Sequence, residues 1–420
     1  MIPQDYSRVN IEAVKPQIDC GRYPIKRVVG EKVAVSADIY KEGHDKLSAV
    51  LKTRKVGEKA WQESPMTLAL NDDWYGEFSV TEIGPWEYTI EAYADHYRSW
   101  VEEISKKNLP GAKLESELLE GMAIIRKSAA LAKGEDRARI ESIIDAMDKA
   151  ITAGEQQGAV DLGIGGVLHS LMAKYPDRSE GYELAPTLKV MVNRPISRFA
   201  AWYEFFPRSQ STTPHKHGTL QDSIRRLPAI KAMGFDVIYL PPIHPIGHSF
   251  RKGKNNSLTA TPDDVGSPWA IGNEHGGHTG LEPKLGTWDD WDQFVATCRE
   301  LEIEIALDYV MNCSPDHPYV AAHPEWFFHR PDGSIKYAEN PPKKYQDVYP
   351  LNFGTADRAG LWQEMLRVFL FWIDKGVTTF RVDNPHTKPV AFWEWVIGQV
   401  HRQHPGVIFL AEAFTKPKMM

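Results

Sequence analysis

The stretches VTTFRVDNPH (residues 377–386) and VIFLAEAF (407–414) decide the fold of this chain. Each contains an apolar run of strand length that ends in charged or polar residues, and a Trp-rich helical pattern separates the two. Three further runs precede them and alternate with helical patterns: RFAAWYEFFP (198–207), DVIYLPPIHPIG (236–247) and IEIALDYVMN (303–312). Strands that alternate with helices predict a parallel sheet, and here the (β/α)8 TIM-type barrel class.

The count of barrel strands ends at five, and the sequence ends at KPKMM (416–420) directly after the fifth. An eight-stranded barrel cannot close with five strands. Two interpretations are open: an open sheet, or a C-terminally truncated piece of a longer protein in which only about the first five strands are present. We favour the second. An isolated piece of this kind is expected to fold poorly, because it would expose two sheet edges.

The chain is predicted to be multidomain, because 420 residues are too many for one hydrophobic core. Residues 1–110 are predicted to form an N-terminal, Ig-like β-sandwich. Short strand patterns such as KVAVSADIY (32–40) alternate there with turn-forming residues.

Residues 111–190 are predicted to form a helical insert, because the segment 114–154 repeats apolar residues every three or four positions and contains no proline. Its apolar stripe could pack within the chain or serve as a dimer interface. Residues 191–420 then form the partial catalytic barrel, with a loop subdomain at about 313–355.

The composition argues against two classes of partner. The formal net charge is -7 and no long basic run occurs, so no nucleic-acid partner is expected. Neither an apolar run long enough for a membrane helix nor a signal-peptide pattern is visible, so no membrane partner is expected. Cys20, Cys298 and Cys313 are widely spaced, which favours a reducing compartment. A cytoplasmic protein fits these features.

Polar residues gather where the last three predicted strands end. Asp308 and Asn312 follow the third strand, Arg381 and Asp383 close the fourth, and Glu412 closes the fifth. In a parallel barrel the carboxyl ends of the strands meet at the face that carries the active site. These side chains are therefore expected to lie together.

The two carboxyls on neighbouring strands suit a retaining glycosyl transfer. Arg381 lies two positions from Asp383, so the two side chains leave the strand on the same side, and the arginine favours an ionised nucleophile. Glu412 lies in an apolar run, where desolvation raises a carboxyl pKa as a general acid requires. Adjacent strands can hold the two carboxyls about 5–5.5 Å apart, the spacing for retention. The alternative is a structural salt bridge, which explains one such acid more easily than three.

The motifs FRVDNPH, ALDYVMN and FLAEAF resemble the catalytic regions of the α-amylase superfamily (glycoside hydrolase family 13). RVDNPHTKP, RKGKNNS, NPPKKYQD and CSPDHP narrow the resemblance to the family of α-1,4-glucan:maltose-1-phosphate maltosyltransferases, and so does the opening segment 8–31. This resemblance covers essentially the whole chain. It implies an N-terminal β-sandwich, a helical domain used in dimer formation, and a (β/α)8 catalytic barrel.

The resemblance also assigns roles to residues by their place in each motif. Asp383 resembles the nucleophile, Glu412 the acid/base and Arg381 the residue that steadies the nucleophile. The residues that resemble donor-site or other substrate-binding positions are Lys252, Asn340, Tyr345, Asn384, Asp308 and Asn312. For Lys252, in the basic stretch RKGK, a solvated loop charge is the competing interpretation. Cys313 stands where amylases usually carry histidine, and the third catalytic carboxylate would follow the fifth strand.

No metal or other cofactor is expected. His244, His248, Asp263, His275 and His278 cluster in the sequence, but their spacing matches no compact ligand motif. Loop or substrate-lining roles are the preferred interpretation, and the chemistry that the resemblance implies requires no metal.

The expected function is transfer of a maltosyl unit from α-maltose 1-phosphate to the non-reducing end of an α-1,4-glucan, with release of phosphate. It would proceed through a covalent glycosyl-enzyme intermediate in a homodimer. Two alternatives remain open: another α-amylase-superfamily enzyme, such as a hydrolase or a trehalose synthase, or an inactive glucan-binding fragment.

Overall fold

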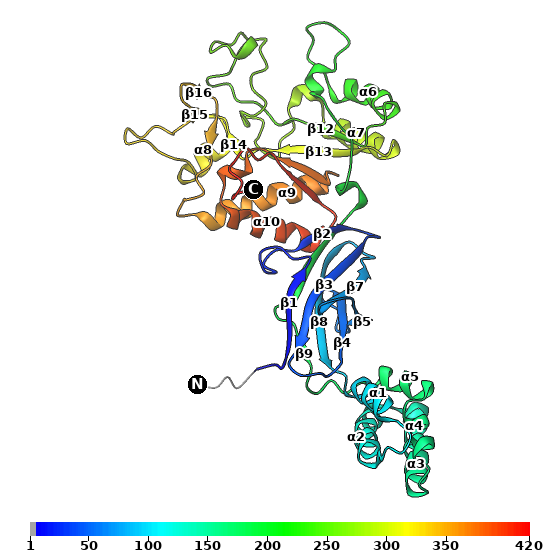
Figure 1. The fold of residues 1–420 in the computed structure, drawn as a ribbon. Helices are drawn as coiled ribbons and strands as arrows, with labels where there is room; N and C mark the ends of the chain where they lie inside the picture. The colour runs from blue at the N-terminus through cyan, green and yellow to red at the C-terminus, as the bar shows by residue number, and fades with distance from the viewer. Residues whose placement is uncertain (1–5) are drawn as a thin grey trace. The chain divides into compact units, whose positions relative to one another are not determined.

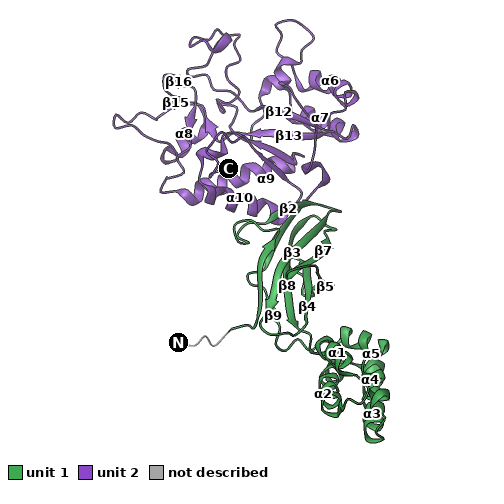
Figure 2. Cartoon of the chain, viewed as in Figure 1, with its two compact units in different colours: residues 1–192 green, residues 193–420 purple. Residues whose placement is uncertain are grey.

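The computed structural model of the chain describes residues 6–420 (Figure 1). It divides into two compact units, Met1–Val192 and Asn193–Met420 (Figure 2). The predicted start of the barrel domain at residue 191 lies within two residues of this division.

The first unit contains a β-sandwich of two sheets. One has the strand order β1-β3-β7-β6, and the other has the order β2-β10-β8-β4-β5, with β9 also paired to β8. The strands are β1 (Val9–Lys15), β2 (Ile25–Val28), β3 (Lys32–Lys41), β4 (Leu47–Lys55), β5 (Gln62–Pro65), β6 (Thr67–Leu68), β7 (Asp73–Ser79), β8 (Gly84–Ala94), β9 (Tyr182–Glu183) and β10 (Leu188–Asn193).

Alternation along the strands builds the core of the sandwich. In β3, Val33, Val35, Ala37 and Ile39 are all buried, while the residues between them face outward. Side chains point to opposite faces at successive positions of a strand, so this period of two places one apolar face against the other sheet.

The sandwich is assembled from two separated stretches of sequence. β10 lies across the end of the predicted helical insert and the start of the predicted barrel, yet it pairs antiparallel with β8, Val190 opposite Trp86. Val190 and Val192 are buried and alternate with less buried neighbours. This short strand was not predicted from the sequence. β10 joins β2 to β8 in the sheet, so the helical insert ends before residue 188.

A module of five helices lies between these two stretches. The helices are α1 (His96–Lys107), α2 (Glu115–Leu131), α3 (Gly134–Thr152), α4 (Gln156–Gly163) and α5 (Gly166–Lys174). α1 begins at the cap Asp95, earlier than the predicted start at 111, because the Asp95 side chain accepts a hydrogen bond from the Arg98 N–H. Buried Trp100 of α1 contributes to a core of its own with α2, α3, α4 and α5.

The second unit contains a five-stranded parallel sheet in the order β11-β12-β13-β18-β19. These strands lie within the five stretches predicted for the barrel: β11 (Trp202–Glu204), β12 (Val237–Leu240), β13 (Glu304–Tyr309), β18 (Thr379–Val382) and β19 (Ile408–Ala411). All neighbouring pairs are parallel. Within the described chain, β11 and β19 form the two edges of the sheet.

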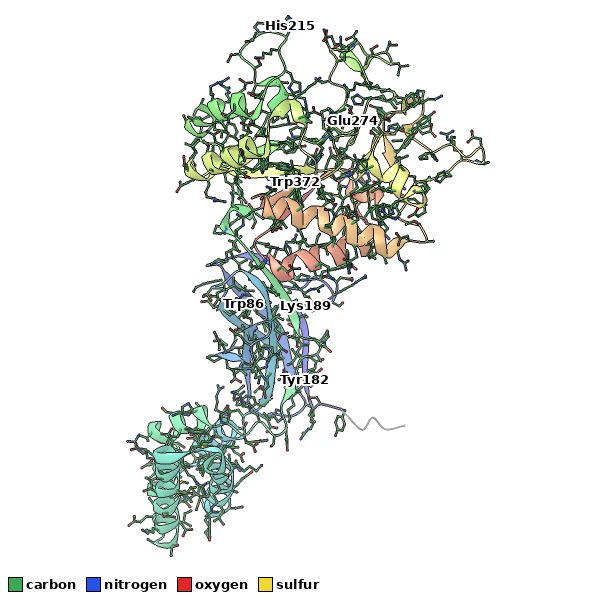
Figure 3. The ribbon with its side chains drawn as sticks, turned by 180° about the vertical axis from the view of Figure 1, so that it is seen from behind. Trp86, Tyr182, Lys189, His215, Glu274 and Trp372 are labelled. Atoms are coloured by element: carbon green, nitrogen blue, oxygen red, sulfur yellow. The ribbon has the colours of Figure 1, made fainter. Side chains whose placement is uncertain are left out.

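Helices separate these strands along the chain: α6 (Leu220–Ala232), α7 (Trp288–Glu300), α9 (Arg358–Asp374) and α10 (Val390–Gln403). They bury Trp291, Phe369 and Phe392 in the same core as the strand residue Phe380. Trp372 of α9, labelled in Figure 3, is 1% exposed and donates its indole N–H to the carbonyl of His278. The loop side of the sheet is thereby tied to the helical layer.

The region predicted as a loop subdomain, about 313–355, carries two small antiparallel ladders and a short helix. β14 (Asn312–Cys313) pairs with β17 (Tyr349–Pro350), and β15 (Ala338–Asn340) pairs with β16 (Lys343–Tyr345). α8 (Pro318–Ala322) lies between them in sequence. No helix within residues 6–420 has the length and apolar character needed to cross a membrane.

The packing of Trp100 generates a prediction about two helical glycines. A Cβ added at Gly121 would lie 2.1 Å from a carbon of the Trp100 indole, whereas one at Gly158 would meet nothing nearer than 3.9 Å. Gly121→Ala should therefore lower the free energy of unfolding by about 1–3 kcal/mol through overpacking. Gly158→Ala should raise it by about 0.5–1 kcal/mol through helix propensity. Chemical denaturation of both variants tests this, and equal effects would contradict the packing described here.

Candidate active site

Three neighbouring strands bring the predicted catalytic residues together. Asp308 of β13 pairs in register with Arg381 of β18, and Val382 of β18 pairs with Ala411 of β19. Asp383 and Glu412 follow directly after those two paired residues. Because parallel strands end at the same edge, the register alone places these carboxyls side by side.

Arg381 joins all three carboxyl groups, and we call Asp308, Asp383 and Glu412 the carboxylate cluster. Its Nη1 donates to Asp308 Oδ1 at 2.9 Å and Oδ2 at 3.1 Å, and to Asp383 Oδ1 at 3.0 Å. Its Nη2 forms an ion pair with Glu412. One guanidinium therefore sets the positions of all three acids.

Asp308 is the buried anchor of this arrangement. Its side chain has no exposed surface, and Oδ2 also accepts hydrogen bonds from the Tyr239 hydroxyl at 3.0 Å and the Trp269 indole at 3.1 Å. Burial raises the pKa of Asp308 to about 7, against the opposing effect of Arg381. A carboxyl so enclosed orients Arg381 and offers no surface to a ligand. The sequence did not single out Tyr239 or Trp269, because neither carries a charge and they belong to a strand and a loop far from Asp308 in sequence.

Glu412 has the electrostatics of a proton donor. Burial raises its pKa above the usual glutamate value, and the neighbouring Asp383 raises it further, while Arg381 opposes both. A carboxyl whose proton is held more tightly than usual, beside a second carboxyl, is the arrangement by which glycosidic chemistry separates an acid from a nucleophile.

Asn384 adopts the left-handed backbone conformation (φ 44°, ψ 53°) directly after Asp383. Its side-chain amide donates to Asp383 Oδ2 at 3.2 Å, and its backbone N–H donates to Glu412 Oε2 at 3.4 Å. Non-glycine residues occupy this region rarely, and asparagine is among the more tolerant. The turn therefore aims two donors at the carboxylate cluster.

Lys388 is a further residue that the sequence did not single out. Burial lowers its pKa to about 8, with the charge of Asp383 acting in the opposite direction. Its ammonium donates to the Thr387 hydroxyl at 2.8 Å. A signal was present in the sequence, since the lysine lies within the motif RVDNPHTKP five positions after Asp383, but a lone lysine there does not reveal its burial.

Of the predicted donor-site residues, Asn384 lies at the carboxylate cluster, whereas Lys252, Asn340 and Tyr345 lie on or beside the β15–β16 hairpin. Lys252 is 7% exposed and its Nζ donates to Gln346 Oε1 at 3.3 Å, which places it beside the β15–β16 hairpin. Tyr345 ends that hairpin and is half-buried, whereas Asn340 is exposed. The burial of Lys252 is at odds with a solvated loop charge. Within residues 6–420, no hydrogen bond or ion pair joins this group to the carboxylate cluster.

Asn312 begins β14. Cys313, which follows it, belongs to the first of two groups of residues that could bind a metal ion. Cys313 Sγ and ring nitrogens of His278 and His317 lie within 4.8 Å of one another, and all three residues are buried. The other group is His323, Glu325 and Asp357.

A hydrogen-bond chain accounts for the buried group without an ion. His317 Nδ1 accepts the Tyr319 N–H at 3.0 Å, and burial keeps both histidines neutral by lowering their pKa values. His317 Nε2 then carries the proton and donates to His278 Nδ1 at 3.0 Å. His278 Nε2 is buried and has no hydrogen-bond partner among the described residues.

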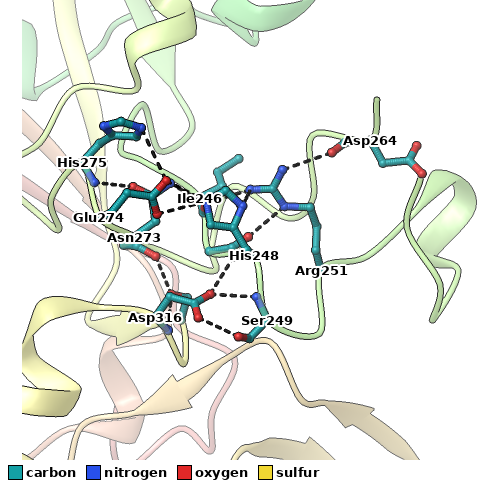
Figure 4. Close-up of polar contacts among 12 residues, drawn as sticks. Ile246, His248, Ser249, Arg251, Asp264, Asn273, Glu274, His275 and Asp316 are labelled. Atoms are coloured by element: carbon teal, nitrogen blue, oxygen red, sulfur yellow. Dashed lines mark hydrogen bonds and ion pairs between the residues drawn. The ribbon is translucent and has the colours of Figure 1, made fainter. Parts of the chain in front are cut away.

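The other candidate ligands of the segment 244–278 lie in loops: His244, His248, Asp263 and His275. His244 is buried with Nδ1 3.1 Å from the Gly280 carbonyl oxygen, while Asp263 is exposed. His248 and His275 both approach the Glu274 carboxylate, His248 Nε2 at 3.1 Å and His275 Nε2 at 3.5 Å (Figure 4). Asp316 accepts two backbone N–H groups and the hydroxyl of Ser249, which fixes this loop to the segment after β14 (Figure 4).

The class of protein to which the parallel sheet belongs, with an arginine and acidic residues at its carboxyl edge, is the α-amylase class. A family model described as the α-amylase catalytic domain matches residues 204–359. Among solved structures, an α-amylase from Lactobacillus plantarum is 30% identical over 51% of this chain and 45% of its own chain. The TM-score is 0.43.

A second family model, described as α-1,4-glucan:maltose-1-phosphate maltosyltransferase, domain N/S, matches residues 7–194. The Myxococcus xanthus protein named α-1,4-glucan:maltose-1-phosphate maltosyltransferase is 49% identical over 98% of this chain and 63% of its own length. A Cereibacter sphaeroides protein of the same name is 45% identical over 99% of this chain and 69% of its own. The chain therefore belongs to the α-1,4-glucan:maltose-1-phosphate maltosyltransferase family. It spans less than two thirds of the Myxococcus relative's length.

The neighbours of Glu412 predict pKa shifts of opposite sign in two variants. Asp383→Asn removes the negative charge that raises the Glu412 pKa, so that pKa should fall. Arg381→Met removes the opposing cation, so the pKa should rise. A titration of the Glu412 carboxyl carbon by NMR, assigned with Glu412→Gln, measures both. An unchanged pKa in both variants would show that burial alone controls this group.

Proposed function

We propose that this chain carries the catalytic nucleophile and acid/base of an enzyme that transfers a maltosyl unit from α-maltose 1-phosphate to the non-reducing end of an α-1,4-glucan. The observation that carries the proposal is the carboxylate cluster held by Arg381, with the Glu412 pKa raised beside Asp383. Relatives 43–49% identical over nearly the whole chain bear the corresponding name.

In the first step, an Asp383 carboxylate oxygen attacks the anomeric carbon of the donor and forms a glycosyl ester. The bond between that carbon and the phosphate oxygen breaks, and the phosphate leaves with the electron pair. Glu412 supplies a proton to the departing oxygen. Hydrogen bonds from Arg381 and Asn384 to Asp383 keep the attacking carboxyl oriented.

In the second step, the terminal 4-hydroxyl of the glucan attacks the same carbon. Glu412, now ionised, accepts the hydroxyl proton, and the ester bond breaks with its electron pair returning to Asp383. Two inversions give retention. An acceptor site that favours a sugar hydroxyl over water would make the reaction a transfer rather than a hydrolysis.

The donor is a sugar phosphate, a dianion, and it requires cationic or neutral donors. We assign this role to Lys252, with Asn340, Tyr345 and Asn384 as neutral partners and Asn312 nearby as a further substrate-binding residue. Asp308 is assigned a positioning role in place of the predicted substrate contact, because its side chain has no exposed surface and binds Arg381.

The five-stranded sheet is proposed to be the first part of an eight-stranded barrel. The 63% coverage of the Myxococcus relative supports this, as do the two edges of the sheet, β11 and β19. The helical module is proposed to form a homodimer contact. A cytoplasmic location is also proposed, supported by three free cysteines among the described residues, one of them exposed.

The decisive test measures phosphate release from α-maltose 1-phosphate with maltohexaose as acceptor, using this chain and the full natural polypeptide. Asp383→Ala should abolish release, by roughly 10³-fold or more, because the oxygen that forms the ester is lost. Product analysis separates the rivals: maltose would indicate a hydrolase, trehalose an isomerase, and glucan binding without turnover a binding fragment.

Lys252 and Lys254 offer a matched pair for the donor site. Both belong to the RKGK stretch, but Lys252 is buried beside the hairpin and Lys254 is exposed. Lys252→Met should raise KM for the phosphorylated donor about 10-fold or more, since one charge-assisted hydrogen bond would be lost. Lys254→Met should leave it unchanged. An equal effect of the two substitutions would remove Lys252 from the donor site.

A further inference from the structure

Arg208 is a buried cation outside the carboxylate cluster. It lies in the turn Pro207–Ser209 after β11 and is 7% exposed. Its Nη1 donates to the Pro242 carbonyl at 3.0 Å, but Nε and Nη2 are buried and have no hydrogen-bond partner among residues 6–420. Burial lowers its pKa only to about 10, so it stays charged at neutral pH. A buried charge without partners is costly, which calls for a ligand.

The two unsatisfied nitrogens form one edge of the guanidinium. Nε–H and one N–H of Nη2 point in parallel, and this fork matches two oxygens of a single oxyanion. The third nitrogen, Nη1, is held by Pro242, which fixes the orientation of the fork. Both nitrogens are enclosed in this structure, so an anion reaches the oriented fork once a neighbouring side chain at the cavity moves aside.

Arg208 lines a cavity of about 130 Å³ whose charges are predominantly positive. Arg251 and Lys284 line the same cavity, and Glu282 is the one carboxylate among its described lining residues. Glu282 forms no ion pair with Arg208 in the described chain, and its Oε1 accepts the Lys284 backbone N–H at 3.3 Å. This volume is well below the roughly 300 Å³ at which sites for larger organic ligands begin, so it suits a small ion.

The charge of Arg251 is also available to a ligand. Its donors are directed at the backbone carbonyls of Gly247, Ile246 and Asp264 and at the ring nitrogen Nδ1 of His248, and not at a carboxylate (Figure 4). The nearby Glu274 is instead engaged by His248 and His275 (Figure 4). Three cations therefore line the cavity, and the charge of Glu282, which raises the pKa of Arg208, offsets only part of theirs.

His217 completes the polar wall. Its Nδ1 lies 2.7 Å from the Gly218 carbonyl oxygen and so acts as the donor there. Burial lowers its pKa, and this effect outweighs the Gly218 hydrogen bond and the charge of Glu282, which raise it, so the ring is neutral at neutral pH. With Nδ1–H committed to Gly218 and the ring neutral, Nε2 is an acceptor, so it can take a hydrogen bond only from a protonated oxygen of a ligand, such as the P–OH of a monoanionic phosphate.

We propose that this cavity is a binding site for a small tetrahedral oxyanion, inorganic phosphate or the phosphate of a small monoester, held by the Nε–Nη2 edge of Arg208 with Arg251 and Lys284 adding positive charge. The site shares no residue with the carboxylate cluster or with the Lys252 group. It does not depend on the transfer reaction proposed above.

Calorimetric titration of inorganic phosphate into the full natural polypeptide tests the site. Arg208→Gln should weaken phosphate binding at this site by at least about 10-fold, since a charge-assisted fork is lost. Lys284→Glu reverses an exposed charge, leaves the core intact, and should weaken it about threefold. Lys113→Glu, an exposed lysine in the other unit, is the matched control and should have no effect.

Two further titrations identify the ligand and keep the two anion sites apart. Lys252→Met removes phosphate binding at the proposed donor site and should leave this one intact, so failure of one proposal does not imply failure of the other. Glucose 1-phosphate competing with phosphate for the Arg208 site would identify the monoester as a ligand, and phosphate binding alone would identify the free ion. Binding of acetate in preference to phosphate would overturn the proposal. Phosphate binding that is unchanged in both Arg208→Gln and Lys284→Glu would also overturn it. The phosphate would then bind elsewhere, and the cavity would hold water only.

Discussion

The second unit depends on one guanidinium that is shared by three carboxyls on successive strands. Arg381 satisfies the buried Asp308, steadies Asp383 and pairs with Glu412. Three acids at one sheet edge would repel one another without that cation. The requirement explains why the strands end in register here, why Tyr239 and Trp269 also donate to Asp308, and why an asparagine tolerates a left-handed conformation between two of the acids.

Much of the fold could be predicted from the sequence because the patterns are long. Alternating apolar strands and helical stretches with regular spacing located all five parallel strands and the helical segment 114–154, which contains α2 and α3. Short elements were harder, because LKVMVN (β10) offers only three buried positions and its partner β8 lies about 100 positions away. α1 was read as part of the sandwich because a single capping aspartate, Asp95, starts it.

The candidate site also has a part that the sequence predicted and a part that it did not. Charged residues at strand ends identified Arg381, Asp383 and Glu412, since parallel topology determines where those ends meet. What the sequence could not supply was burial: the enclosure of Asp308, the desolvation of Lys388 and the packing of Lys252 against the hairpin depend on loops that converge only in three dimensions. The unsatisfied edge of Arg208 belongs to the same category.

The two-part sandwich has a consequence for synthesis on the ribosome. In its sheet, β2 lies at one edge and has β10 as its neighbour among the described strands, and β10 is made more than 150 residues later. The sheet therefore cannot be completed as its first strands emerge, and the helical module must be translated before β10 arrives. Because long-range strand pairing is slow and leaves edges open, the nascent chain passes through an interval in which the β10 side of β8 is unpaired and chaperones have a strand edge to protect.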